Sequence, residues 1–535
     1  MTTRPQTLAS TSAFEVLGPI MVGPSSSHTA GALRCARVAA SLLEGDVTSV
    51  RFTLWNSFSH TYRGHGTDRA LVAGILGLDT DDERIRDAFA LADERGLEYG
   101  FDEAGDDSAL HPNTVDIDMA GSDGTRCVVR GESLGGGRMR VSRINDIDVD
   151  ITGAYSTLFV SHRDVPGALA SLTGLLAHEQ VNIAFCRTYR TEQGGRAYTV
   201  FETDAIPCAD ALLAVRALPC VLSATLISVP GSAGATTPGL SVRDLFDDGA
   251  QLLAACDELG RSIGGVMRLR EERLTGERAA CAQMLRVLRI MREETSEPLR
   301  DPQRSLGGFL GGEARDVARG GQGRLGECLM GAVQTDAVAR AMAVLERSAS
   351  MGVIVAAPTA GSAGVVPGCV LAVADHLGSD DEEVCDALFA AAAVGLDIQT
   401  HACVAGAEGG CQAEVGSASA MAAAAVVQLM GGTPECALHA SSIAIGNLLG
   451  LVCDPVGGLV EVPCQARNAI GVANAFSAAQ LALSGVTSLV PFDEAVQALS
   501  EVGHALPDSL RETAKGGLAA SPTARAACAR CAGCQ

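Results

Sequence analysis

Pro230-Gly-Ser-Ala-Gly-Ala-Thr-Thr-Pro-Gly239 divides the sequence into two halves of different character. The stretch has no bulky apolar residue, and its Gly, Ser, Thr and Pro are typical of a linker. Strand-like and helix-like segments alternate before it, and Ala-rich segments separated by Gly-rich breaks follow it. We therefore predict a multidomain protein with an α/β region at 12–150, a ferredoxin-like domain at 151–229, a linker at 230–240 and an all-α domain at 241–535.

The segment at 151–229 has the most regular pattern. Alternating apolar residues predict strands, 3.6-residue spacing predicts helices, and Asp164-Val-Pro-Gly167 is a turn after the first strand. The resulting order is βαββαβ, which is a ferredoxin-like arrangement. The expected elements are a strand at 157–161, a helix at 168–178, strands at 181–189 and 197–203, a helix at 209–217 and a strand at 221–229.

The flanking regions have less regular patterns. In the first region we expect strands at 50–54, 115–119 and 126–129 and helices at 30–43 and 68–76. After the linker, the amphipathic residues 245–293 predict one long helical region.

Composition limits the classes of function. The chain has 535 residues, 47% of them hydrophobic, and a net charge of −23, which disfavours nucleic-acid binding. Residues 1–12 are polar and lack the apolar core of a signal peptide. The uncharged stretch 349–374 is interrupted by Pro and Gly, so we expect a buried irregular element and no membrane span. We therefore expect a cytoplasmic protein whose 18 cysteines are thiols or metal ligands rather than disulfides.

Two short segments near the N-terminus carry hydroxyl and imidazole groups. Gly23-Pro-Ser-Ser-Ser-His28-Thr29 precedes a helical run, and such a cluster at a helix N-terminus suits an anionic ligand, although a plain helix cap has the same pattern. His65-Gly-Thr-Asp68 contains a residue that accepts a proton near neutral pH. His111-Pro-Asn-Thr114 is a weaker segment of the same kind. A structural role for each histidine stays open.

Ala357-Pro-Thr-Ala-Gly-Ser-Ala-Gly364 places hydroxyl groups between small residues. Such a loop can present hydroxyls and backbone N–H groups to a carboxylate. A tight turn between packed helices explains the same residues.

Three cysteines of the second half, Cys411, Cys453 and Cys464, lie beside Gly or Pro, where the chain can leave helical geometry and aim a thiolate. Three cysteine ligands leave one iron of a cubane open, which makes it a Lewis acid. Buried cysteines in an Ala-rich bundle are also common. The tail Cys528-Ala-Arg-Cys531-Ala-Gly-Cys534 has the spacing of half a metal motif, or is an incidental cysteine tail.

Taken together, these segments resemble the iron–sulfur-dependent L-serine dehydratases. The stretch from Phe14 to Gly31, with the histidine segments and Ser133-Leu-Gly-Gly-Gly137, resembles the β region of that family. Residues 154–229 resemble an ACT domain. The Thr359 and cysteine segments, with Arg511-Glu-Thr-Ala-Lys-Gly-Gly-Leu-Ala519, resemble the α region.

The resemblance implies a [4Fe–4S] cluster held by Cys411, Cys453 and Cys464, with Cys534 at the open iron when substrate is absent. Cys528 and Cys531 are alternative tail ligands. It implies deamination of L-serine to pyruvate and ammonia by β-elimination of water, with the cluster as Lewis acid. Pyridoxal phosphate is not expected, because the only lysine, Lys515, lies in the C-terminal segment.

Within this resemblance we assign roles to the remaining site residues. We expect His65 to be the base that removes the α-proton, and His28 to hold substrate or position the cluster. The expected substrate-binding residues are Ser25, Ser26, Ser27, Thr67, Asp68, Asn113, Thr359, Gly361 and Ser362.

Gly307-Gly-Phe-Leu-Gly-Gly-Glu313 departs from the family pattern, which has Ser and Thr hydroxyls in this segment. Alternative functions are a related iron–sulfur eliminase acting on cysteine or threonine, an ACT regulatory protein with a dead site, and an electron carrier based on the tail. We expect an amino-acid effector at the ACT-like domain, or only dimer contacts there, and a homodimer or higher homo-oligomer with no nucleic-acid partner.

Overall fold

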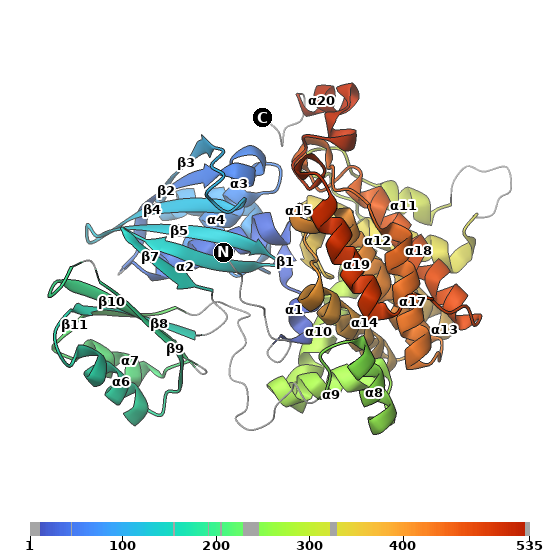
Figure 1. The fold of residues 1–535 in the computed structure, drawn as a ribbon. Coiled ribbons are helices and arrows are strands. Elements are labelled where there is room, and N and C mark those ends of the chain that lie inside the picture. Colours follow the sequence, from blue (N-terminus) through green and yellow to red (C-terminus); the bar gives the residue numbers. More distant parts are fainter. Residues whose placement is uncertain are drawn as a thin grey trace.

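The computed structural model describes residues 11–43, 45–152, 156–190, 192–203, 206–227, 245–320 and 329–529. The predicted linker at 230–240 and the tail residues Cys531 and Cys534 lie outside these ranges. Figure 1 shows an N-terminal α/β region, a small α/β domain beside it and a C-terminal helical region. The predicted fold class is confirmed.

A six-stranded sheet forms the centre of the N-terminal region, in the order β3-β2-β4-β5-β6-β7. Strands β2 and β3 pair in parallel, and the other neighbours are antiparallel. In β2, Val50, Phe52 and Leu54 are buried while Arg51 points to solvent, so alternation along the strand gives the sheet one apolar face. Helices α2 and α4 pack together on this region. The elements are α2 (Ala32–Ser41), β2 (Val47–Trp55), α3 (Asn56–Thr61), α4 (Thr67–Ile75), η3 (Glu83–Asp87), α5 (Ala88–Arg95), β3 (Glu98–Gly105), β4 (Thr114–Gly121), β5 (Arg126–Gly135), β6 (Arg138–Ile144) and β7 (Ile147–Ile151).

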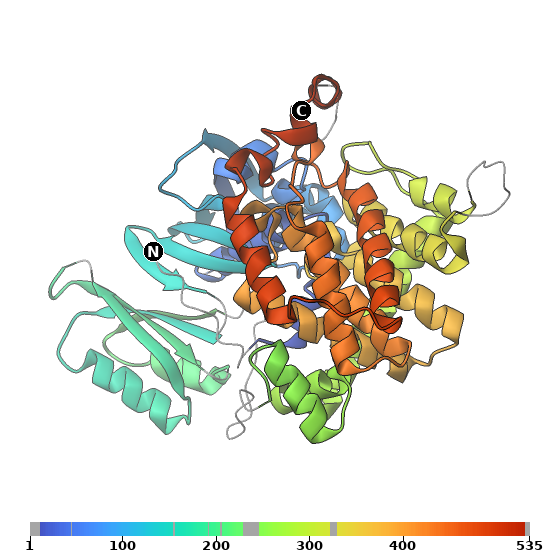
Figure 2. The same ribbon diagram turned by 45° about the vertical axis from the view of Figure 1, so that its right-hand side comes forward.

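The small domain has the expected βαββαβ order and an antiparallel sheet in the order β11-β8-β10-β9. Leu158, Val160 and Phe201 face the helices, and Phe159 and Val200 join the core of the N-terminal region. One face of the sheet thus packs on α6 and α7, and part of the other face packs against the N-terminal region, beside which the domain lies in Figures 1 and 2. The elements are β8 (Ser156–Arg163), α6 (Ala168–His178), β9 (Ile183–Arg190), β10 (Arg196–Thr203), α7 (Ala209–Arg216) and β11 (Val221–Ile227).

The predicted helical region at 245–293 is largely helical and is divided into three helices. Gly260 (φ 60°) and Gly276 (φ 90°) have left-handed backbone conformations that end helices readily. The helices are α8 (Gly249–Leu259), α9 (Ile263–Thr275) and α10 (Glu277–Arg300).

Helices α13, α14, α17 and α18 pack around α16 (Ser417–Leu429), whose alanines let neighbouring helices approach closely. The other elements are α11 (Glu313–Ala318), α12 (Gly331–Ala349), β12 (Val353–Val355), η5 (Ala360–Ser362), α13 (Val365–Leu377), α14 (Asp381–His401), α15 (Gly406–Gly409), η6 (Gln412–Gly416), α17 (Pro434–Leu448), η7 (Val456–Gly458), α18 (Cys464–Leu483), α19 (Phe492–Ala505), η8 (Asp508–Leu510), η9 (Gly517–Ala520) and α20 (Pro522–Cys528).

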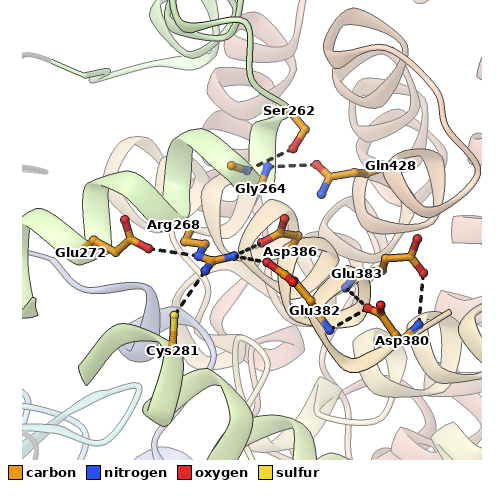
Figure 3. Close-up of polar contacts among 11 residues, drawn as sticks. Ser262, Gly264, Arg268, Glu272, Cys281, Asp380, Glu382, Glu383, Asp386 and Gln428 are labelled. Carbon is orange, nitrogen blue, oxygen red and sulfur yellow. Dashed lines mark hydrogen bonds and ion pairs between the residues drawn. The ribbon is translucent and has the colours of Figure 1, made fainter. Parts of the chain in front are cut away.

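A polar network ties α9 to α14 at the surface (Figure 3). The guanidinium of Arg268 donates to Glu272 at 3.1 Å, Glu382 at 3.3 Å and Asp386 at 3.4 Å. It also lies 3.5 Å from the Sγ atom of Cys281 on α10. One cation therefore joins three helices.

The N-terminal segment lies against the helical region rather than the sheet. Strand β1 (Ile20–Val22) pairs antiparallel with β12, and helix α1 (Ala13–Val16) packs near α14, where the rings of Phe14 and Phe389 lie 6.3 Å apart. The backbone N–H of Ala13 donates to Glu271 at 2.8 Å. The N-terminal segment therefore packs on the second half of the same chain and joins the two halves. The sequence pattern does not predict this contact.

The stretch 349–374 is buried, as expected, but it is more regular than predicted. It contains β12, η5 and most of α13. Residues Ala360–Leu377 are long and apolar enough to cross a membrane, yet 78% of this window is buried inside the fold, as in a core helix.

Candidate active site

The serine-rich loop begins a short π-helix, η2 (Ser26–Gly31). Ser25 is its N-cap, and its hydroxyl accepts the backbone N–H of His28 at 3.0 Å. Gly23 has φ 97° and packs against Thr29, so the turn before the cap needs glycine. The loop is therefore both a helix cap and a set of hydroxyl groups turned toward the rest of the site.

His28 and His65 form a buried stacked pair with ring centroids 4.4 Å apart. The Nδ1 atom of His28 lies 3.1 Å from the Ser27 hydroxyl, and its Nε2 atom lies 2.9 Å from the Ser57 hydroxyl. Burial lowers the pKa of His28 well below its usual value and that of His65 to about 4. Both rings are therefore neutral at pH 7.

The two histidines differ in what their nitrogens contact. The Nδ1 atom of His65 lies 3.2 Å from the carbonyl oxygen of Thr61, so it carries the proton and donates to that carbonyl. Its Nε2 atom is buried and has no hydrogen-bond partner. A neutral imidazole with a free Nε2 lone pair can accept a proton, whereas both nitrogens of His28 already contact hydroxyl groups.

A pocket lies where the two halves meet. Its N-terminal wall contains the three serines of the capped loop, the segment around Asn113 and the loop Leu134–Gly136. Its C-terminal wall contains Thr359, Gly361, the 405–408 loop, Glu414, Cys453, Cys464 and Glu512.

Cys411, Cys453 and Cys464 come together beside this pocket from three separate segments. Cys411 directly precedes η6, Cys464 begins α18, and Cys453 exchanges backbone hydrogen bonds with the 510–512 segment, in which its N–H donates to Leu510 at 2.8 Å. All three are buried. Besides burial, the charge of Cys411 raises the pKa of Cys453 and Cys464, so these thiols lie close to one another. Burial raises the pKa of Cys411 to about 12 and that of the other two well above the usual value, so the bare thiols stay protonated.

Arg467 supplies positive charge next to these thiols. Its guanidinium donates to the Val452 carbonyl at 2.8 Å and to Asp454 at 2.6 Å. Its charge favours the thiolate form of Cys411 and Cys464, against the effect of burial. Three buried cysteines with one nearby cation are a donor set that fits an iron–sulfur cluster, because thiolates are the ligands such clusters take.

Two carboxyl groups at the pocket are absent from the predicted site. Glu414 accepts a hydrogen bond from the Thr359 hydroxyl at 2.7 Å and lies 3.9 Å from the Cys453 sulfur. Burial, and then repulsion from Glu414, raise the pKa of Glu512 to about 8. Glu414 stands three residues after Cys411 within the predicted cysteine segment, but only the folded chain shows that it reaches the Thr359 loop.

The structure brings eight of the predicted site residues to the pocket lining, while His28, His65 and Cys411 lie behind it. Thr67, Asp68 and Ser362 do not line the pocket. Thr67 is buried, and burial raises the pKa of Asp68 to about 6. Ser362 lies behind Thr359, with their hydroxyl oxygens 3.2 Å apart. Lys515 is exposed and does not line the pocket.

The segment that departs from the family pattern is held from within by a buried carboxylate. Glu461 accepts hydrogen bonds from the Ser305 hydroxyl at 2.6 Å and from the backbone N–H groups of Gly307 at 2.7 Å and Phe309 at 3.0 Å. None of these residues lines the pocket. Glu461 also lies three residues before Cys464, so it links this loop to the start of α18.

Comparison with known proteins gives three family matches in one chain. Residues 12–143 match the family described as serine dehydratase beta chain, residues 156–220 match the ACT domain, and residues 224–519 match serine dehydratase alpha chain.

Individual relatives agree with these matches. The chain is 31% identical over 510 residues to the L-serine dehydratase of Streptomyces coelicolor, covering 94% of this chain and 96% of the relative. It is 52% identical over 218 residues to a probable L-serine dehydratase alpha chain of Bacillus subtilis, covering 41% of this chain and 72% of that one. It is 45% identical over 181 residues to the L-serine dehydratase beta chain of Peptoniphilus asaccharolyticus, covering 34% and 82%.

Proposed function

Because the chain belongs to the serine dehydratase family, we propose that it deaminates L-serine to pyruvate and ammonia by β-elimination of water. The observation that carries the proposal is the pocket between the two halves, which is lined by a hydroxyl-rich loop and two buried cysteines and is backed by a neutral histidine pair. Serine needs two kinds of help, removal of a weakly acidic α-proton and departure of its β-hydroxyl.

Cys411, Cys453 and Cys464 would hold a [4Fe–4S] cluster. The support is their burial, their mutual proximity and the cation of Arg467 beside them. When bound, such a cluster with one open iron supplies a Lewis acid that makes the β-hydroxyl a better leaving group. Cys534 is proposed as the ligand that covers that iron without substrate, with Cys528 and Cys531 as alternatives, and Cys528 ends helix α20.

His65 would take the α-proton on Nε2. The Thr61 carbonyl fixes the tautomer by accepting from Nδ1, and burial keeps the ring neutral. His28 is stacked against it and is held by Ser27 and Ser57, which suits a positioning residue. A base fixed in one tautomer and one orientation needs no rearrangement before it accepts a proton.

The hydroxyl and backbone groups around the pocket would bind the substrate carboxylate. Ser25, Ser26, Ser27, Thr359 and Gly361 line the pocket from both halves. Ser362 would support Thr359 from behind, and Thr67 and Asp68 would act through the helix that follows His65. After water leaves, aminoacrylate tautomerises and hydrolyses to pyruvate and ammonia.

The small domain would bind an amino-acid effector near Asp164-Val-Pro-Gly167, and the chain would act as a homo-oligomer in the cytoplasm. In this turn the Asp164 carboxylate accepts the backbone N–H of Gly194 at 3.0 Å, and Gly167 (φ 88°) begins α6.

The proposal is tested by anaerobic reconstitution with iron and sulfide, followed by a pyruvate assay with L-serine and no added pyridoxal phosphate. We expect activity that follows the iron content and is lost in air. Full turnover by protein free of iron would contradict the cluster, and no turnover by fully loaded protein would contradict the substrate.

A further inference from the structure

The pocket has an acidic lining. Glu408, Glu414 and Glu512 line it, and no Lys or Arg is found among its described lining residues. Burial raises the pKa of Glu414 and Glu512, and a cation bound beside either group would lower that pKa again and favour the carboxylate. An amino acid carries one negative and one positive group. The hydroxyl-rich loops suit the carboxylate of such a ligand. The carboxyl groups of the pocket wall are therefore available to its ammonium group.

Glu512 lines the pocket and is fixed there through its backbone. Its backbone N–H donates to the carbonyl of Cys453 at 2.8 Å, and its φ of 60° is unusual for a residue with a side chain. Its carboxyl group lies within 4.8 Å of ring nitrogens of His28 and His65. A group that contacts Glu512 from the pocket is therefore brought close to the histidine pair.

Glu414 and Glu408 are less suited to meet a ligand's cation at this position. Glu414 already accepts the Thr359 hydroxyl at 2.7 Å and packs against Gly361 and Gly406. Glu408 is exposed. Glu512 thus combines a pocket-lining position with proximity to the histidines.

Asn113 provides a second, independent indication of a ligand. Its side-chain Nδ2 donates to the carbonyl of Ser133 at 3.4 Å, which orients the amide. Its Oδ1 atom is buried with no partner, and the residue lines the pocket. A buried acceptor without a donor costs about 1–3 kcal/mol. A donor supplied by a ligand would remove that cost, and an ammonium group has three.

We propose that Glu512 and Asn113 form the subsite for the α-ammonium group of the substrate. This inference rests on the proposed function, because it assumes an amino-acid substrate. Holding the ammonium at Glu512 places the adjacent α-carbon on the side of the pocket nearest His65. It also leaves the serine loop and Thr359 to the carboxylate, so each end of the zwitterion meets groups of suitable polarity.

The test compares L-serine with 3-hydroxypropionate, which keeps the carboxylate and β-hydroxyl but has no amino group. In Glu512→Gln we expect the KM for L-serine to rise about 10- to 100-fold, the usual effect of losing a charged hydrogen bond. The inhibition constant of 3-hydroxypropionate should change less than about twofold, and kcat should fall less than KM rises. Glu512→Asp keeps the charge and should recover part of the affinity. Asn113→Ala should show the same selectivity in weaker form.

Glu501→Gln is the matched control, since Glu501 is an exposed carboxylate on α19 that bonds to Gln497. It should leave both constants unchanged. The visible absorbance of the reconstituted protein shows whether each variant keeps its cluster.

Two results would overturn the inference. One is an unchanged KM for serine in Glu512→Gln, and the other is an equal loss of affinity for serine and 3-hydroxypropionate. Failure of the proposed function itself is distinguishable, because the loaded parent protein would then turn over no serine.

Discussion

The rings of His28 and His65 lie stacked with an interplanar angle of 27°, and only His65 keeps a ring nitrogen without a partner. The pair therefore divides into a supporting ring and a ring with a free lone pair. This difference gives the first prediction.

His65→Ala should retain the cluster but lose about 10²- to 10⁴-fold in turnover, the usual contribution of a general base. The measurement is the pyruvate rate beside the visible absorbance of the cluster. His504→Ala is the control, because His504 is exposed at the end of α19. Near-normal turnover in His65→Ala would move the base to another residue.

The depressed pKa of His65 also predicts a dependence of stability on pH. Above pH 6.5 the ring is neutral in the folded and unfolded states, so it contributes nothing. As the pH falls from 6.5 toward about 4, only the unfolded state takes up the proton, so folding loses up to roughly 3 kcal/mol from this residue. Urea denaturation at pH 7.5, 6 and 5 should show a smaller decline for His65→Asn than for the parent. Equal declines would show that His65 titrates normally.

Cys411→Ala, Cys453→Ala and Cys464→Ala should each lower the bound iron and abolish turnover, because a cluster that loses one of three protein ligands is no longer held. Cys436→Ala is the control, since Cys436 lies on α17, is only partly exposed and does not line the pocket. Iron and sulfide analysis after anaerobic reconstitution measures the result. Full iron loading in any of the three variants would remove that cysteine from the ligand set.

Glu461→Ala should destabilise the protein by about 2–4 kcal/mol. The three groups that donate hydrogen bonds to the Glu461 carboxylate would be left buried without an acceptor. The free energy of unfolding from urea titration measures the loss. Glu501→Ala changes an exposed carboxylate and should have little effect. A change below about 0.5 kcal/mol in Glu461→Ala would show that water replaces the carboxylate.

Cys534→Ser should lower the apparent KM for serine and shorten the lifetime of the cluster in air, if the tail covers the open iron. The residue is outside the described part of the chain, but the 510–512 segment already lies beside Cys453. Steady-state kinetics and the decay of visible absorbance measure the two effects. Parent-like values in Cys534→Ser, Cys531→Ser and Cys528→Ser would make the tail incidental.

Local features of the sequence predicted the fold well. Alternation of apolar and polar residues predicted β2 and β4, and helical spacing predicted α6 with its observed bounds. Ser25 caps the helix that follows the serine-rich loop, as the sequence of that loop indicates. Strands β3, β6 and β7 were missed. β3 pairs with β2, which is distant in the sequence, so its local pattern does not decide its structure, whereas β6 and β7 pair with the strands next to them in the chain and were within reach of the sequence pattern.

The site was predictable only in part. The cysteines and histidines stand in recognisable segments, whereas Glu414 and Glu512 gain meaning from contacts with Thr359 and with the histidine pair. A carboxylate in a helical or tail segment is ordinarily a solvated surface group. Nothing in its immediate neighbours separates Glu512 from such a group, and its position depends on the backbone pairing with Cys453.

The pairing of β1 with β12 has a consequence for synthesis on the ribosome. Ile20–Val22 leaves the exit tunnel early, but its partner Val353–Val355 follows roughly 330 residues later, which at 5–20 residues per second is on the order of half a minute. Throughout that interval the strand lacks its native sheet partner, although the domains between them can already fold. The nascent chain thus carries an unpaired strand edge until its second half is made, and the same short strand joins the finished halves to each other.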